Sequence, residues 1–117
     1  MGTGELAVNK EVVRRLYEDL FTRGRLELTG ELMSEDYVNH DPPPGRGHTR
    51  EDVRATVASF HDGLADLTAR IDRIAAEGDL VAVQGTINGV APSGERTRIA
   101  MSEFFRLENG RIAERWS

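Results

Sequence analysis

The chain contains no cysteine, a single lysine and no long run of apolar residues. Without cysteine it cannot form disulfide bonds, thiolate nucleophiles or thiolate metal ligands. No apolar segment reaches the roughly 20 residues that a membrane-spanning helix requires, and the N-terminal segment lacks the apolar run of a signal peptide. We therefore expect a cytoplasmic protein that does not enter a membrane.

Positive charge is scarcer than negative charge. The net charge is −5, and Lys10 is the only lysine beside the arginines. Because nucleic-acid binding needs a clustered positive field, this composition argues against a nucleic-acid partner. The 3 histidines do not have the spacing of metal ligands. We expect no metal ion and no other cofactor.

The first half of the chain has helical patterning. A length of 117 residues is that of one domain, which we take to span residues 1–117. Apolar residues recur at helical spacing from Val8 to Phe21, and Gly24 is the expected C-terminal cap. A shorter helix is predicted over 26–33. Thr49 opens a capping box with Asp52, which predicts a third helix that continues to residue 64.

The second half alternates apolar and polar residues, as half-buried strands do. Strands are predicted over 67–71, 80–88, 96–107 and 112–117, and a hairpin turn at Asn109-Gly110 joins the last two. Before the third helix, Tyr37–Asp41 reads as a short strand that the prolines after it end. Helices followed by an antiparallel meander predict an α+β fold in which a curved sheet carries helices on one face.

One acid interrupts the apolar face of the strand over 96–107. Alternation places Glu103 on the same face as Ile99, Met101, Phe105 and Leu107. A buried Glu103 should be protonated or strongly hydrogen-bonded, because unpaired burial of a charge is costly. A protonated acid there would donate a hydrogen bond to a developing oxyanion. Alternatively, the strand twists and turns the carboxylate outward to an arginine.

A second polar cluster, Asn39-His40-Asp41, lies where the short strand meets the prolines. Asp41 is either a turn residue or a general base held rigid by the proline loop. His40 is the alternative base, since its ordinary pKa suits proton transfer near neutral pH. Alternation lets only one of the two face inward, and Asn39 shares the face of Asp41.

The register of the last strand decides what lies beside Glu103. A two-residue turn places Glu114 and Trp116 on its face, where Trp116 would raise the pKa of the acid by desolvation. A bulged turn instead brings Arg115 and Ser117 inward, and Arg115 would then ionise Glu103. We prefer the first register because it buries the apolar tryptophan.

Four stretches carry a family resemblance: NKEVVRRLYEDLFTRGRLE, SEDYVNHDPPPGRGHTREDVR, EGDLVAVQGTING and SEFFRLENGRIAERW. Together they resemble the SnoaL-like group of polyketide cyclases and ester-cyclase-like proteins. That group belongs to the superfamily of ketosteroid isomerase, scytalone dehydratase, limonene epoxide hydrolase and nuclear transport factor two. The resemblance implies a cone-shaped, cystatin-like α+β roll in which a curved antiparallel sheet wraps the N-terminal helices around an apolar pocket.

The resemblance also implies roles for three residues. Asp41 stands just before a proline, as the catalytic base of ketosteroid isomerases does. Tyr17 stands seven residues before a glycine, like their oxyanion tyrosine, and Glu103 stands three residues before an arginine, like their oxyanion acid. The acid-base aspartate of the polyketide cyclases has its nearest match in Ser117, and their histidine-containing segment is replaced by Gly85–Gly89.

The predicted function is acid/base chemistry on a small hydrophobic carbonyl compound, of isomerase or cyclase type and without cofactor. Asp41 would remove a proton next to the carbonyl, while Tyr17 and protonated Glu103 stabilise the enolate. The other pocket residues are predicted to be Asn39, His40, Phe60, Met101, Phe105, Glu114 and Trp116.

Two alternatives remain open. One is a non-catalytic module for ligand binding or dimerisation, and the other is an epoxide hydrolase built on Asp41, Arg115 and Glu103. Whichever function holds, a homodimer is expected, because an open sheet face usually needs covering.

Overall fold

The helices and one strand lie in the first half of the chain and the other strands in the second half in this computed structural model, which describes residues 3–117. The first half contains α1 (Thr3–Arg15), the π-helical η1 (Leu16–Thr22), the 3₁₀ turn η2 (Leu26–Leu28), α2 (Thr29–Leu32), β1 (Met33–Asn39) and α3 (Arg50–Gly63). The second half contains β2 (Ala65–Glu77), β3 (Leu80–Val90), β4 (Arg96–Glu108) and β5 (Arg111–Trp116). Within residues 3–117, no helix is both long and apolar enough to cross a membrane.

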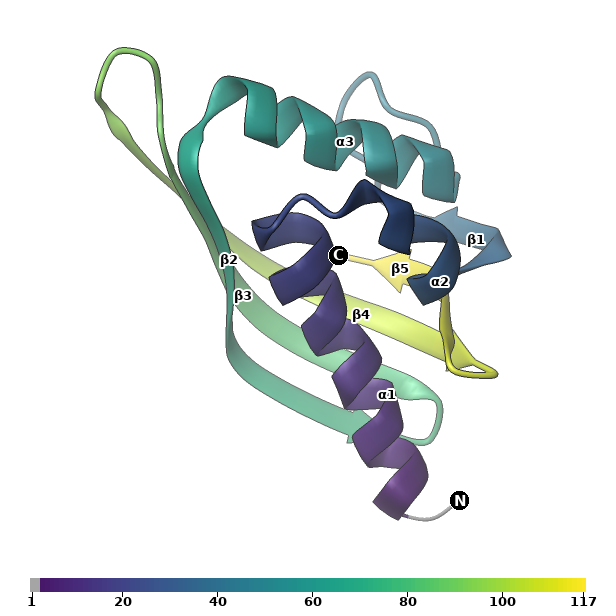
Figure 1. Cartoon of the computed structure of the whole chain (residues 1–117). Helices are drawn as coiled ribbons and strands as arrows, with labels where there is room; N and C mark the ends of the chain where they lie inside the picture. Colours follow the sequence, from purple (N-terminus) through teal and green to yellow (C-terminus); the bar gives the residue numbers. More distant parts are fainter. Residues whose placement is uncertain (1–2) are drawn as a thin grey trace.

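The strands form one sheet in the order β1-β5-β4-β3-β2. Neighbours from β5 to β2 are antiparallel, whereas β1 runs parallel to β5. The sheet curves, and α1 and α3 lie on its concave side (Figure 1). The predicted α+β class with a curved sheet around N-terminal helices is confirmed. The parallel pairing of β1 brings the Asn39 end of that strand beside the end of the chain.

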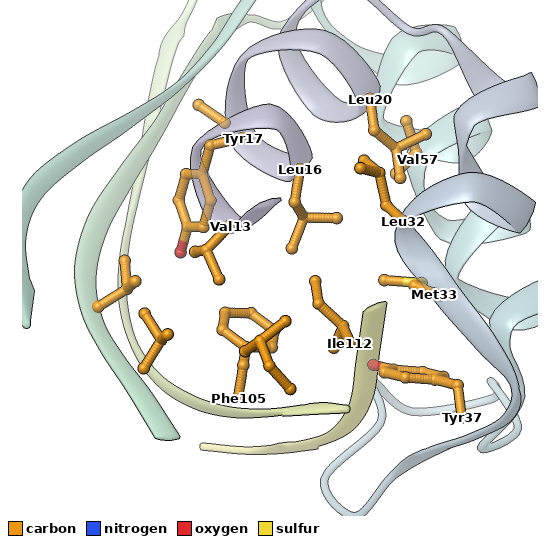
Figure 2. Close-up of a cluster of buried hydrophobic side chains, with 14 of the residues drawn as sticks. Val13, Leu16, Tyr17, Leu20, Leu32, Met33, Tyr37, Val57, Phe105 and Ile112 are labelled. Atoms are coloured by element: carbon orange, nitrogen blue, oxygen red, sulfur yellow. The ribbon is translucent and has the colours of Figure 1, made fainter. Parts of the chain in front are cut away.

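The core lies between the helices and the concave face of the sheet (Figure 2). Its least exposed side chains come from both layers and include Val13, Leu20, Val57, Phe105 and Ile112, each at most 1% exposed. Burying a side chain of this size stabilises the fold by about 1.5–3 kcal/mol. The helical and strand periodicities of the sequence therefore meet in one apolar core.

A capping box and a hairpin turn form at the residues where the sequence predicted them. The Thr49 side chain accepts a hydrogen bond from the backbone N–H of Asp52, and the Asp52 carboxylate accepts one from the N–H of Thr49. This capping box begins α3. At the β4–β5 hairpin, Asn109 and Gly110 have φ angles of 52° and 77°. Two positive φ values are what a tight hairpin turn with the right twist requires.

The helix that carries Tyr17 departs from the prediction of a continuous α-helix. From Leu16 to Thr22 the chain is π-helical. The Thr22 hydroxyl donates to the backbone oxygen of Tyr17 at 2.8 Å and accepts from the N–H of Ala69 on β2, also at 2.8 Å. The Thr22 hydroxyl therefore connects the π-helical segment to β2 of the sheet. Short π-helical segments are frequent at functional sites.

The register of β5 also departs from the prediction. Leu107 pairs with Ile112, but Arg106 pairs with Glu114, so Ala113 is an extra residue in β5. Ile112 and Ala113 are consecutive and both buried. Such a bulge reverses the alternation of side chains beyond it. The preferred register is therefore wrong: the chain buries both residues at the bulge and then turns Arg115 inward.

Candidate functional site

A cavity of about 270 Å³ opens between the helices and the concave face of the sheet. Most of its wall is apolar, and its polar or charged lining residues are Tyr17, Tyr37, Asn39, Asp41, Arg46, Asp52, Thr56, Glu103 and Arg115. This volume lies just below the range of about 300–1,000 Å³ that is common for small-molecule sites, so the cavity suits a small ligand. Among the described residues, no group of three His, Asp or Glu side chains is placed to hold a metal ion.

Glu103 is the buried acid of the cavity, with 5% of its surface exposed. The Tyr17 hydroxyl donates a hydrogen bond to Oε2, and Arg115 Nε donates to Oε1 at 2.6 Å. Both carboxyl oxygens therefore accept, and the guanidinium supplies a compensating charge. The surroundings of Glu103 differ from those of the predicted donor, because both of its oxygens have partners and the bulge in β5 places the Arg115 guanidinium beside it.

Arg115 connects this pair to the end of β1. Its Nη1 donates to Asn39 Oδ1 at 3.1 Å and to the backbone oxygen of Asp41 at 3.0 Å. The hydrogen bonds that Arg115 forms within residues 3–117 use Nε and Nη1, which leaves the two N–H groups of Nη2 for a ligand. A guanidinium fixed at Nε and Nη1 presents Nη2 in a set direction, since its donors lie in one plane.

Asp41 lies at the rim of the cavity, just beyond the end of β1. Its backbone N–H donates to Asn39 Oδ1 at 3.0 Å, and its Oδ2 accepts from the backbone N–H of Ser117 at 2.9 Å. The buried Asn39 also donates its backbone N–H to the oxygen of His48 at 2.8 Å. These bonds hold the Asp41 carboxylate in place, and its hydrogen bond within residues 3–117 uses Oδ2 and leaves Oδ1 for a ligand.

The chain has two tyrosines, and both line the cavity. Burial raises the pKa of Tyr17 well above its usual value, and the Glu103 charge raises it further. Burial also raises the pKa of Tyr37. The Arg115 charge lowers this pKa, and the Glu103 charge raises it to a smaller extent. Both hydroxyls therefore keep their protons at neutral pH.

Seven of the ten predicted site residues line this cavity: Tyr17, Asn39, Asp41, Phe60, Met101, Glu103 and Phe105. They come from η1, from β1 and the loop after it, from α3 and from β4. The geometry joins Tyr17 directly to Glu103, whereas Asp41 connects to them only through Arg115.

The remaining three predicted residues, His40, Glu114 and Trp116, lie outside the cavity, and their prediction as pocket residues is wrong. His40 Nε2 is 3.0 Å from Glu114 Oε1, and the His40 ring stacks on Trp116 with centroids 5.0 Å apart. Arg106 Nε also donates to Glu114. Alternation turns His40 away from the face of Asn39, and the bulge turns Glu114 and Trp116 to the same outer side.

Two functional candidates stand outside the main prediction from the sequence. Arg115 faces inward only in the alternative register of the last strand, and the bulge at Ala113 gives β5 this register. Tyr37 was not selected at all, although strand alternation places it on the face of Asn39 and Asp41. The i, i+2, i+4 spacing of Tyr37, Asn39 and Asp41 is the feature of the sequence that could have identified Tyr37 as a site residue.

The helices on a curved sheet and the cavity between them are the architecture of a ketosteroid isomerase-like α+β fold. A protein with such a fold from Catenulispora acidiphila is 18% identical, with a TM-score of 0.74 over 90% of this chain and 82% of that one. A structure from Bacillus cereus, assigned as a polyketide cyclase, is 19% identical, with a TM-score of 0.91 over 99% of this chain and 76% of that one. At these identities the likeness concerns the fold.

The SnoaL-like domain family matches residues 13–115, and the chain belongs to this family. Wild-type IdmH from Streptomyces antibioticus, assigned as a polyketide cyclase, is 29% identical, with a TM-score of 0.81 over 92% of this chain and 88% of that one. A loop-truncated variant of IdmH is 31% identical, with a TM-score of 0.80 over 92% and 89% of the two chains. No protein of curated function matches the chain.

Proposed function

We propose that this protein is an enzyme that removes a proton next to a carbonyl group in a small hydrophobic molecule. One observation carries the proposal: an arginine with two available N–H groups is hydrogen-bonded to the backbone of an aspartate at the rim of an apolar cavity. A base and a positively charged donor side by side are the requirement for forming an enolate.

Asp41 is the proposed base. Its Oδ1 takes the proton from the carbon next to the carbonyl, the C–H electron pair forms a C=C bond, and the carbonyl π electrons move to oxygen. Protonated Asp41 then returns the proton two carbons further along a β,γ-unsaturated ketone, which gives the conjugated isomer. The proton is conserved on the enzyme, so the sequence needs no co-reactant. A positioned base of this kind contributes about 10²–10⁴-fold to the rate.

Arg115 is the proposed stabiliser of the enolate oxygen, through the N–H groups of Nη2. An oriented donor facing a developing oxyanion contributes about 10²–10³-fold. Glu103 and Tyr17 act as positioning residues: Glu103 holds Nε of the guanidinium, and the Tyr17 hydroxyl holds the other oxygen of Glu103. This assignment replaces the direct donor roles that the sequence suggested for these two residues.

Cyclisation is the second reaction that the same enolate permits. The enolate carbon would attack another carbonyl carbon of the same molecule, forming a C–C bond, and protonated Asp41 would give its proton to the new alkoxide. Membership of the SnoaL-like family and the likeness to IdmH support this branch. Both branches begin with the same proton transfer to Asp41.

Epoxide hydrolysis is the alternative that one specific observation favours. Arg115 donates to the Glu103 carboxylate and to the backbone oxygen of Asp41, and so connects two acidic residues in the acid-arginine-acid order expected of such enzymes. Incubation of an apolar epoxide in ¹⁸O-labelled water separates the two chemistries. Labelled diol would favour hydrolysis, whereas conversion of a ketone without label incorporation favours the enolate reaction.

The test of the main proposal is an ultraviolet assay for conversion of a β,γ-unsaturated cyclic ketone to its conjugated isomer. Turnover by the native chain should fall at least about 10²-fold in Asp41→Asn, which keeps the shape but removes the base. His40→Asn is the matched control, because His40 adjoins Asp41 but lies on the outer side. Equal losses in both variants, or no loss in Asp41→Asn, would overturn the assignment of the base.

We also propose a homodimer formed through the outer face of the sheet. Phe104 is 53% exposed there and pairs with Trp116 on β5. Leu80 on β3 is also exposed on this face, at 40%. Light scattering on the native chain should give twice the monomer mass, and Phe104→Asp should halve it. A native monomer would exclude this assembly.

A further inference from the structure

Tyr37 has a buried hydroxyl that no group of residues 3–117 satisfies. The residue is 3% exposed, and within the described part of the chain its hydroxyl has no hydrogen-bond partner. Buried polar groups are normally paired, because leaving one unpaired is costly. The other tyrosine follows this rule, since the Tyr17 hydroxyl donates to Glu103. Of the two tyrosines, Tyr37 is therefore the one whose hydroxyl needs an explanation, and the Ser34 hydroxyl is the other buried side-chain oxygen without a partner among the described residues.

The position of Tyr37 connects it to the candidate site. It lies on β1 two residues before Asn39, on the same face of the strand, and its side chain forms part of the cavity wall. In Figure 2 its ring enters the apolar cluster with the hydroxyl directed inward. Burial raises the pKa of this hydroxyl and keeps it protonated. The Arg115 charge lowers the same pKa, and the Glu103 charge raises it. Tyr37 is thus a neutral donor on the wall of the cavity that Glu103 and Arg115 also line, and its strand β1 is hydrogen-bonded to β5, which carries Arg115.

We propose that the Tyr37 hydroxyl donates a hydrogen bond to the substrate oxygen, beside Arg115, and so completes a two-donor oxyanion site. This proposal rests on the function proposed above, because it names the group that shares the enolate oxygen with the guanidinium. The ligands it selects have a phenol, enol or carbonyl oxygen on an apolar skeleton of one or two rings. A neutral hydroxyl and a cation together favour an oxygen that gains negative charge during the reaction.

A binding experiment tests Tyr37 without requiring turnover. The probes are 2-naphthol and naphthalene, which share one ring skeleton and differ by one oxygen. The native protein should bind 2-naphthol about 10-fold more tightly, or 1.4 kcal/mol, and Tyr37→Phe should reduce this preference to near unity. Thr29→Val is the matched control, because the buried Thr29 hydroxyl is not part of the cavity lining and donates to the backbone oxygen of Leu26 at 2.7 Å. The control should keep the preference.

Thermal unfolding of Tyr37→Phe tells a ligand-binding hydroxyl from a structural one. The midpoint should be equal to or higher than that of the native chain, since the substitution removes no bond within the protein. A clearly lower midpoint would show that the hydroxyl has a structural partner, such as a buried water, and would overturn the proposal. An unchanged naphthol preference in Tyr37→Phe, or no preference in the native chain, would also overturn it.

The two proposals fail in different ways. A Tyr37-dependent preference for 2-naphthol without any ketone turnover would refute the enolate reaction and leave Tyr37 as a binding residue. Asp41-dependent turnover with an unchanged rate and unchanged preference in Tyr37→Phe would refute the role of Tyr37 alone. If both hold, Tyr37→Phe should lower kcat by about 10²-fold or more, as loss of one oxyanion donor does.

Discussion

Arg115 Nε lies 2.6 Å from Glu103 Oε1, and this contact joins the last strand to the floor of the cavity. The side chains are 14% and 5% exposed, so water screens the pair weakly. Neither residue can be removed alone without leaving a buried, unpaired charge. The pair therefore links the stability of the domain to the geometry of the proposed site.

Arg115→Met should destabilise the fold by about 3–5 kcal/mol, because it strands the Glu103 carboxylate in an apolar cavity. Urea unfolding measures this directly. The double variant Arg115→Met/Glu103→Gln should recover much of the loss, since no charge is then buried. Arg98→Met on the exposed side of β4 is the control and should stay within about 0.5 kcal/mol of native. A single variant as stable as the control would refute a buried ion pair.

The tyrosines offer a spectroscopic prediction. Burial raises the pKa of Tyr17 above its ordinary value of 10.0, and that of Tyr37 likewise. The folded state therefore prefers the protonated form, and its stabilisation is complete below pH 10 and lost as the pH rises above it. Tyrosinate absorbance should be absent from the folded protein at pH 10 and should appear only as the chain unfolds. Half-ionised tyrosine in folded protein at pH 10 would contradict the burial of both hydroxyls.

Gly85 on β3 makes room for the ring of Tyr17. A Cβ at this position would lie 2.6 Å from Tyr17 Cε2 and 2.9 Å from the Arg70 backbone oxygen. Gly85→Ala should therefore destabilise the fold by about 1–3 kcal/mol, as overpacking does. Gly63→Ala, with no atom within 4 Å of the new Cβ, is the opposite control and should be neutral or stabilising. If both variants behave alike in urea unfolding, the close approach is not real.

The outer cluster of His40, Arg106 and Glu114 predicts acid sensitivity. Hydrogen bonds from Arg106 and then His40 hold the pKa of Glu114 below its ordinary value of 4.5. A lowered pKa contributes stability above pH 4.5, and this contribution is lost as the pH falls through the lowered value. The melting temperature of the native chain should therefore approach that of Glu114→Gln below pH 4.5. The exposed Glu77→Gln is the control, and a similar pH profile for both variants would contradict the prediction.

Local chemistry made much of the fold predictable. The capping box at Thr49 and the Asn109-Gly110 turn each depend on residues close together in the sequence, and both appear where expected. The buried acid at Glu103 was also predictable, because strand alternation placed it among apolar residues. The family resemblance then located Asp41 and Tyr17 on the cavity wall.

The partners of these residues depended on features that a local pattern does not contain. The bulge at Ala113 reverses which side chains face Glu103, and the apolar character of Trp116 favoured the wrong register. The π-helical turn around Tyr17 depends on Thr22 contacting Ala69 in a distant strand. Tyr37 had the right alternation, but only the fold reveals that its hydroxyl has no protein partner among the described residues.

The most direct test of the account is deuterium incorporation next to the carbonyl of a saturated cyclic ketone in heavy water, followed by proton NMR. This measurement reports proton removal by Asp41 whether the later product is an isomer or a ring. The native protein should catalyse the exchange, and Asp41→Asn should lose about 10²–10⁴-fold of the rate with its fold intact. Exchange that is equally fast in Asp41→Asn, or no exchange by the native protein, would contradict the enolate chemistry proposed for this site.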